Sequence, residues 1–160
     1  MDAVMAFVQG TLDEEIYMKI PDGFNEYYQG NLEGKVLKLN KALYGLKQSG
    51  ILWYQLLETD LVEMGLRQSS FDSCAYTKVD QNKDLVIVTI CVDDLLIFSN
   101  SIKLKNWVKE QFKKRFEMKD LGTASYCLGI KIERDRKNGS ISINQTQNIK
   151  RMLRKYNLHE

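Results

Sequence analysis

The most apolar stretch of the chain, residues 85–98, carries two adjacent aspartates, Asp93 and Asp94. A run with so few polar residues is typical of strands that are buried on both faces. Burying an ionised carboxylate is unfavourable unless it is paired, hydrogen-bonded or bound to a metal ion, so the pair indicates a site. A plain turn through residues 92–94 is the alternative, because aspartate favours turns, although Asp-Gly or Asn-Gly would be expected. This segment by itself leaves the two interpretations open.

A third aspartate, Asp2, lies in the opening segment, residues 1–10. Two aspartates at the tip of an apolar hairpin and one on a different strand form the arrangement by which a polymerase palm gathers carboxylates around two Mg²⁺ ions. Hard cations prefer oxygen ligands, and Mg²⁺ is usually held by one or two carboxylates, waters and substrate phosphates. If the three aspartates converge, a divalent metal is the natural way to relieve their mutual repulsion.

Further motifs follow along the chain in the order that one known family has them. At these motifs the chain resembles the reverse transcriptase of copia-type long-terminal-repeat retrotransposons. The matching segments are residues 1–10, the first catalytic motif; 14–24, the strand and loop after it; 39–48 with Trp53 and Tyr54, the second motif; 91–94, the signature hairpin; and 116–122 and 128–130, the two motifs that follow. Together these segments cover nearly the whole chain, and their joint occurrence is far more specific than any single one.

The resemblance implies three groups of functional residues. Asp2, Asp93 and Asp94 would be catalytic and would hold two Mg²⁺ ions, for which Mn²⁺ can substitute, with Asp94 the more peripheral ligand. The nucleotide-binding residues would be Phe7, Tyr44, Gly45, Lys47, Gln48 and Lys119, and the primer-contacting residues would be Cys91, Val92, Leu128, Gly129 and Ile130. Phe7 would block a ribose 2′-hydroxyl and so select deoxynucleotides. Without the resemblance, Phe7 would be assigned to the core, the loop around Gly45 to a turn before a helix, and Lys119 to the solvated surface.

The chain departs from the family pattern at four positions. Cys91 stands where the signature hairpin usually has tyrosine, and Cys127 stands where phenylalanine is frequent. Gly50 and Ile51 replace a frequent proline and arginine, which affects the rigidity of the preceding loop and a phosphate contact.

Basic residues recur within residues 103–115, which we interpret as a solvated helix face. They recur again within 150–155, where a thumb would begin to follow duplex phosphates.

Composition indicates a globular domain without a membrane-spanning segment. The chain has 160 residues, of which 44% are hydrophobic and 28% charged, and its net charge of +2 means that affinity for nucleic acid must come from local patches. Three widely spaced cysteines without a CxxC pair indicate reduced thiols, and the only histidine, His159, excludes a histidine-based triad. A membrane span needs about 20 apolar residues, more than the unbroken run here provides. We therefore expect an intracellular protein, in a cytoplasmic particle or the nucleus, without a signal peptide.

Periodicity predicts mixed helices and strands. We expect strand running into helix over residues 1–8, strands at 15–19, 35–39, 74–79, 85–91, 95–99, 126–133 and 141–144, and helices from Ser49 to about Met64, from Ser101 to about Phe116, and from Thr146 to about Tyr156. Trp53, Leu57, Leu61 and Met64 share one face of the first helix, and Leu104, Val108, Phe112 and Phe116 share one face of the second. Ser101 and Thr146 are the expected N-caps.

These elements predict an α+β, ferredoxin-like polymerase palm, an antiparallel sheet with helices on one face, with the fingers missing and the thumb only begun. Residues 1–133 would form the palm, and residues 134–160 the end of the primer-grip region and the start of the thumb. The predicted function is RNA-directed DNA polymerase, which transfers a nucleotide from a dNTP to a primer 3′-hydroxyl. Its partners would be an RNA or DNA template with primer and the rest of a polyprotein, including fingers, thumb and ribonuclease H.

Two other functions fit the same scaffold. The first is a catalytically inactive relic or interaction module that keeps the palm fold, and the departures at Gly50 and Ile51 favour it while the intact aspartates oppose it. The second is an RNA-recognition domain, which would need exposed aromatics in a Lys/Arg-Gly-Phe/Tyr pattern on a central strand. That pattern does not occur in the sequence, and the corresponding strand carries aspartates.

Overall fold

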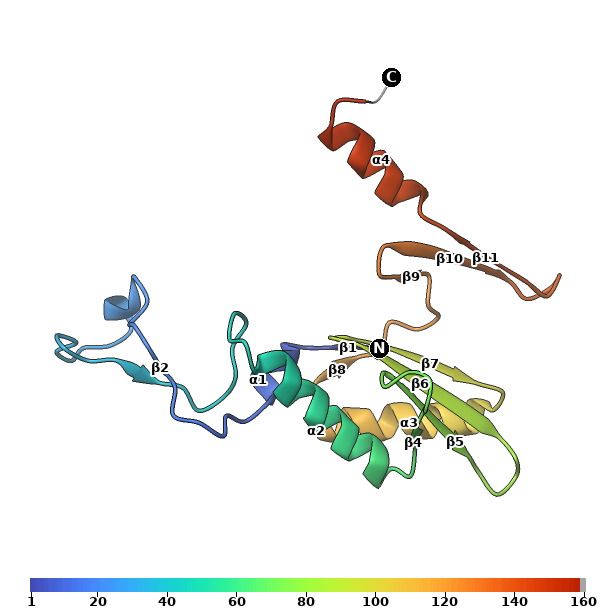
Figure 1. Cartoon of the computed structure of the whole chain (residues 1–160), viewed down its shortest axis with the longest axis horizontal. Helices are drawn as coiled ribbons and strands as arrows, with labels where there is room; N and C mark the ends of the chain where they lie inside the picture. Colours follow the sequence, from blue (N-terminus) through green and yellow to red (C-terminus); the bar gives the residue numbers. More distant parts are fainter. Residues whose placement is uncertain (159–160) are drawn as a thin grey trace.

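The computed structural model describes residues 1–158 and combines strands with helices (Figure 1). Its strands are β1 Asp2–Ala3, β2 Tyr17–Met18, β3 Leu37–Lys38, β4 Arg67–Gln68, β5 Ala75–Val79, β6 Leu85–Cys91, β7 Asp94–Ser99, β8 Met118–Lys119, β9 Tyr126–Cys127, β10 Ile130–Asp135 and β11 Ser140–Asn144. Its helices are α1 Ala6–Gln9, α2 Ser49–Glu63, α3 Ile102–Arg115 and α4 Thr146–Lys155, with a short 3-10 helix at Phe24–Glu26. The predicted α+β class with antiparallel sheets is confirmed. His159 lies outside the described residues.

The main body is a six-stranded sheet in the order β4-β5-β6-β7-β1-β8, in which all neighbouring strands are antiparallel. Helices α2 and α3 cover the same face of this sheet. Trp53 and Leu57 of α2 and Val108 of α3 belong to one buried cluster with Val86 and Val88 of β6. Since alternate residues of a strand point to opposite faces, the core lies between one face of the sheet and the two helices.

The strand β6 is buried on one face only, contrary to the expectation that this apolar run is buried on both. Val86, Val88 and Ile90 are buried, whereas the intervening Ile87 and Thr89 are partly exposed. The reason is topological, because both long helices pack on the same side of an antiparallel sheet and leave the other side open. This open face is where the aspartates lie.

The two long helices form where periodicity predicts them. Their predicted apolar faces are buried, including Trp53, Leu57 and Leu61 of α2 and Val108 and Phe112 of α3. Burial of one apolar stripe is the main source of stability for such helices. The predicted cap at the start of α3 is also present, because the Ser101 side chain accepts a hydrogen bond from the Leu104 amide.

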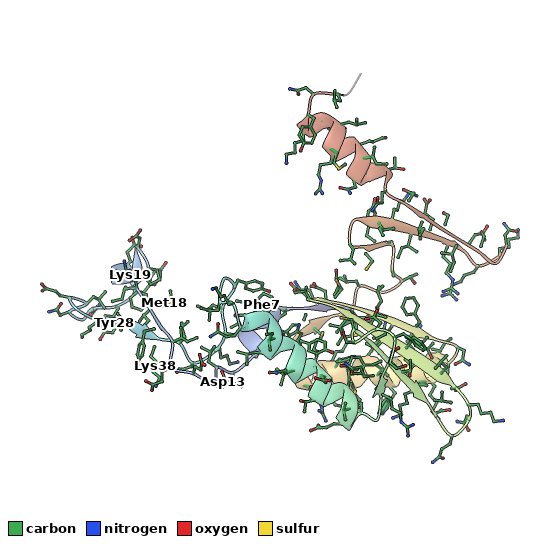
Figure 2. The ribbon with its side chains drawn as sticks, viewed as in Figure 1. Phe7, Asp13, Met18, Lys19, Tyr28 and Lys38 are labelled. Carbon is green, nitrogen blue, oxygen red and sulfur yellow. The ribbon has the colours of Figure 1, made fainter. Side chains whose placement is uncertain are left out.

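Residues 11–41 form an arm that extends away from the main body (Figure 1). Its two-stranded sheet pairs β2 with β3, shorter strands than predicted, and an ion pair joins Lys38 to Glu15. Met18, Lys19, Tyr28 and Lys38 all lie on this arm, whereas Phe7 lies in α1 at the edge of the main body (Figure 2). A pair of two-residue strands buries little surface, so the arm contributes little to the core.

A second, three-stranded sheet in the order β11-β10-β9 follows the main body, and α4 comes after it. The predicted single strand over residues 126–133 is wrong, because Leu128 and Gly129 have positive φ angles of 52° and 77° and reverse the chain. Two positive φ angles in a two-residue loop are the pattern of a tight hairpin turn. Thr146 is the first residue of α4 rather than its cap, and the capping position is Gln145 without a side-chain bond.

Two short strands, β4 and β8, were not predicted at all. Each has two residues and pairs at an edge of the main sheet, β4 with β5 and β8 with β1. Two-residue strands carry no detectable alternation, so only their tertiary pairing reveals them. The expected division at residues 133 and 134 stays a prediction, and it falls within β10. Within residues 1–158, no helix is long and apolar enough to cross a membrane.

Candidate active site

Four side chains form a row across four strands of the main sheet. Asp2 of β1 lies directly opposite Asp94 of β7 on one side and Lys119 of β8 on the other. Asp94 in turn lies opposite Cys91 of β6. Directly opposed residues of antiparallel strands present their side chains on the same face. The row lies on the open face, because Leu95, the residue after Asp94, is buried on the helix-covered side.

The hairpin between β6 and β7 has a two-residue loop, Val92 and Asp93. Backbone hydrogen bonds fasten this loop to β1, from the Ala3 amide to the Asp93 carbonyl at 2.8 Å and from the Leu95 amide to the Met1 carbonyl at 2.8 Å. The N-terminal ammonium also donates to the Leu95 carbonyl at 2.6 Å, and burial is the main cause that lowers the pKa of this ammonium. The turn and the site interpretation are therefore compatible, because the turn itself brings the aspartates to Asp2.

The loop of this hairpin is conformationally strained at Val92. Its φ angle is +54°, in the left-handed region that β-branched residues rarely adopt. A positive φ at the first of two loop residues is the pattern of a type II′ turn, in which glycine is the usual residue. Strain of this kind persists only where surrounding contacts hold it, and it clusters at functional sites. One such contact is the indole N–H of Trp53, which donates to the Val92 carbonyl at 2.7 Å.

The side chain of Asp93 lies beside an aromatic group, Phe7 and Tyr44, whose two rings come from two other segments of the chain. Its Oδ2 accepts a hydrogen bond from the Tyr44 hydroxyl at 3.5 Å, and the Tyr44 ring lies against the Phe7 ring with centroids 4.6 Å apart. Burial first and the negative charge of Asp93 second raise the pKa of the Tyr44 phenol. The structure thus brings together Phe7, Tyr44 and Asp93, which the sequence assigned separately to nucleotide binding and catalysis.

The rest of the predicted nucleotide loop leads into α2. Gly45 has a φ of +102°, which explains glycine at this position. Lys47 is exposed, Gln48 is the residue before α2, and the buried Ser49 hydroxyl donates to the Leu43 carbonyl at 2.6 Å. These contacts fix the loop as a turn that precedes a helix, beside the aromatic group.

The turn between β9 and β10 carries the predicted primer-contacting residues Leu128, Gly129 and Ile130, and β9 lies within electrostatic range of Asp94 and Cys91. Cys127 of β9 has a raised thiol pKa, first because of burial and then because of the negative charge of Asp94. Leu128 and Gly129 form the tip, with Leu128 exposed and in the left-handed region, and Ile130 begins β10. The loop from β8 to β9 therefore returns the chain to the open face of the sheet.

The three aspartates differ in how they could hold a metal ion. Asp2 and Asp94 share a face and a register position, whereas Asp93 lies in the turn with an oxygen near Tyr44. Within residues 1–158, no three histidine, cysteine, aspartate or glutamate side chains converge closely enough to form a metal-binding group. Two opposed carboxylates on an open face suit Mg²⁺ when waters and substrate phosphates complete its shell. The residues present therefore fit a site that substrate would complete.

Trp53 belongs to the second motif, but the sequence did not place it among the predicted site residues. Its apolar spacing placed it on the buried face of α2, which is correct, since its side chain is 1% exposed. A buried tryptophan nevertheless needs an acceptor for its indole N–H, and this requirement was the signal that could have directed attention to it. The acceptor is the Val92 carbonyl in the loop that carries Asp93.

Comparisons of the sequence with known proteins identify the family of the chain. The family described as Reverse transcriptase (RNA-dependent DNA polymerase) matches residues 1–160, so the chain belongs to this family. Over 158 residues, or 99% of this chain, it is 36% identical to the "Retrovirus-related Pol polyprotein from transposon TNT 1-94" of Nicotiana tabacum. It is 37% identical over 134 residues, 84% of this chain, to the corresponding polyprotein from transposon RE1 of Arabidopsis thaliana. The resemblance that the motifs indicated is confirmed.

The chain spans only part of these relatives. It covers 12% of the tobacco polyprotein, 9% of the Arabidopsis one and 45% of a putative transposon Ty5-1 protein of Saccharomyces cerevisiae, to which it is 33% identical over 89% of its own length. No solved structure matches the chain significantly. Family membership therefore rests on sequence, and the site geometry rests on this structure.

Proposed function

We propose that this chain is the palm portion of an RNA-directed DNA polymerase within a transposon polyprotein. The observation that carries the proposal is the strand register that sets Asp2 opposite Asp94, with Asp93 in the adjoining turn. Two carboxylates from strands far apart in sequence, at the open face of a sheet, with a third carboxylate in the adjoining turn, suit transfer of a nucleotide from a dNTP to a primer 3′-hydroxyl.

Sheet topology supports the ferredoxin-like palm. The strands β8-β1-β7-β6 stand side by side in this order, and α2 and α3 provide the two crossovers that cover one face. Chain order β1, α2, β6, β7, α3, β8 is the split β-α-β arrangement of that fold. Strands β4 and β5 extend the sheet beyond β6 and leave this arrangement unchanged.

The register favours Asp2 and Asp94 as the residues that would hold Mg²⁺, in contrast to the more peripheral role that the resemblance implies for Asp94, and Asp93 would join them when substrate displaces the Tyr44 hydroxyl from its oxygen. Bound Mg²⁺ would make the primer hydroxyl a stronger nucleophile and neutralise charge on the triphosphate, and Mn²⁺ can substitute. Lys119, opposite Asp2, would supply a further positive charge near the phosphates. Phe7, held by the Tyr44 ring, would form the wall that excludes a ribose 2′-hydroxyl.

The primer and template would lie between the open face of the sheet and α4. A groove between the β9–β10 turn and α4 is lined by Tyr126, Gly129, Gln147, Asn148, Lys150, Arg151 and Arg154. Cationic and amide side chains are the groups that contact a phosphate backbone. We propose that this groove holds the backbone of the primer strand, with Leu128 at the exposed tip beside it.

Primer extension on an RNA template with Mg²⁺ and deoxynucleotides tests the function. The assay compares the chain, Asp93→Asn, and Asp13→Asn, which removes the same charge from the exposed arm. Extension by the chain and by Asp13→Asn, together with loss in Asp93→Asn, would support the proposal. The same three proteins are also assayed with the flanking polyprotein segments attached. Silence of all the longer versions would refute polymerisation and favour the inactive interaction module.

A further inference from the structure

The loop that carries Asp93 is held by two bonds that come from opposite sides. The Ala3 amide donates to the Asp93 carbonyl from β1, and the Trp53 indole donates to the Val92 carbonyl from α2. The first bond belongs to the sheet that also carries Asp2. The second is a hydrogen bond from a side chain of the helix layer, so it fixes the position of the loop relative to the buried core.

The Trp53 ring has little freedom to move. Its side chain is 1% exposed, and it packs edge-on against Phe116 with ring centroids 5.2 Å apart. Phe116 follows α3 and is itself buried in the same cluster. A buried ring packed against Phe116 presents its N–H at a fixed point, which makes it a better anchor than an exposed side chain would be.

The bond from Trp53 acts on the strained residue of the loop. Val92 is held at a φ of +54°, and an L-residue left to itself returns to negative φ. If Val92 relaxed, its peptide plane would rotate, and Asp93, the next residue, would move with it. The strained geometry is therefore maintained from outside the loop, and the indole bond is the side-chain contact available for that purpose.

We infer that Trp53 is a positioning residue for Asp93, which acts by holding the Val92 carbonyl and with it the left-handed turn. This inference rests on the proposed function only in assigning a catalytic role to Asp93. The conformational part stands without it. Apolar periodicity alone assigns Trp53 to the core, so the inference depends on the donor at the edge of the ring rather than on the ring's burial.

A matched substitution can remove the donor and keep the ring. Trp53→β-(3-benzothienyl)alanine places sulfur where the N–H stands, with nearly the same shape, and is introduced by stop-codon suppression so that Trp107 is unchanged. Leu57→Ala, in the same buried face of α2, is the control for general loss of core packing. Hydrogen exchange of the Ala3 amide, which bonds to Asp93, is compared with exchange of the Val88 amide in the middle of β6.

The expected result is local. The sulfur variant should lower the protection of the Ala3 amide by about tenfold relative to the Val88 amide, because a partly buried carbonyl loses its donor. Leu57→Ala should not lower protection of the Ala3 amide selectively. Adding Val92→Gly to the sulfur variant should restore much of the lost protection, because glycine adopts positive φ without an external bond.

Two outcomes would overturn the inference. One is unchanged relative protection of the Ala3 amide in the sulfur variant, and the other is a loss of protection that Val92→Gly fails to reduce.

A separate measurement tests the catalytic link, namely paramagnetic broadening of the Asp2 and Asp94 amide signals by Mn²⁺. If the unmodified chain shows no broadening, the proposed metal site fails while the exchange result still decides the conformational role. If the unmodified chain does show broadening, the sulfur variant should need a several-fold higher Mn²⁺ concentration for the same broadening. An equal Mn²⁺ concentration for both proteins would overturn the link to Asp93.

Discussion

Removal of one charge at Asp120 should show how strongly α3 holds the edge strand that carries Lys119. Both oxygens of Asp120 accept hydrogen bonds from Lys109, at 2.8 and 2.9 Å, and the two side chains are 30% and 16% exposed. Exposed ion pairs contribute about 0.2–1 kcal/mol and hydrogen bonds to charged groups about 1.5–3 kcal/mol. For this partly screened pair we expect Asp120→Asn to cost about 1 kcal/mol at pH 7. The Asn oxygen can still accept from the Gly122 amide, as Asp120 does at 3.0 Å.

The contribution of the Asp120 ion pair to the free energy of unfolding should depend on pH. The Lys109 ammonium is the main cause that lowers the pKa of the Asp120 carboxyl in the folded protein. A lowered folded-state pKa contributes stability above the unfolded pKa, and that contribution is lost as the pH falls through the folded pKa. The difference in free energy of unfolding between the chain and Asp120→Asn should therefore be full at pH 7 and should shrink as the pH falls below the ordinary aspartate pKa of about 3.9.

Urea unfolding at several pH values measures this difference. Glu110→Gln is the matched control, because it removes one charge from the more exposed pair with Lys113 on the same helix, and it should cost about 0.3 kcal/mol or less. A loss in Asp120→Asn that is as large at pH 2 as at pH 7 would refute the reasoning. So would a loss in the control that equals the loss at Asp120.

Three further predictions concern the core, the start of α2 and the aromatic group. Leu57→Ala, at a fully buried position, should lower the free energy of unfolding by about 3 kcal/mol. Ile51→Ala, at a position 61% exposed, should change the free energy of unfolding by less than about 0.5 kcal/mol. Equal losses for the two variants in urea unfolding would contradict this packing. Gly50→Ala should raise the free energy of unfolding by about 0.5–1 kcal/mol, because an added Cβ meets nothing within 4 Å and alanine favours helix, and thermal unfolding that shows no gain would contradict this. In a form that extends primers, Phe7→Ala should increase ribonucleotide incorporation while Tyr44→Phe, which keeps the ring 4.6 Å from Phe7, should not; unchanged selectivity in Phe7→Ala would remove Phe7 from the substrate wall.

The long elements could be predicted because their signals are local. The apolar spacing of Trp53, Leu57 and Leu61 requires a helix with one buried face, and that helix forms. Ser101 before an apolar repeat predicts a capped helix start, and its side chain does accept from the Leu104 amide. Each of these signals lies within a few residues of the structure that it predicts.

Other features could not be predicted, because they depend on contacts between distant segments. Strand β8 has two residues and exists only because it pairs with β1. The turn at Leu128 was predicted as continuous strand, since leucine at a φ of +52° gives no local turn signal. The one-sided burial of β6 follows from where α2 and α3 pack, which an apolar run does not specify.

The features of the candidate site also fall into those that the sequence predicts and those that only the tertiary structure shows. The amino-acid sequence by itself determined that Asp93 and Asp94 sit at the end of an apolar hairpin, that Asp2 opens the chain, and that the motifs have the order of one family. Only the tertiary structure decided that Asp94 faces Asp2, that Tyr44 reaches Asp93, and that Trp53 holds the loop. The physical reason is that hydrophobic periodicity specifies which face of an element is buried, whereas strand partners, register and side-chain anchors arise when segments far apart in sequence pack together.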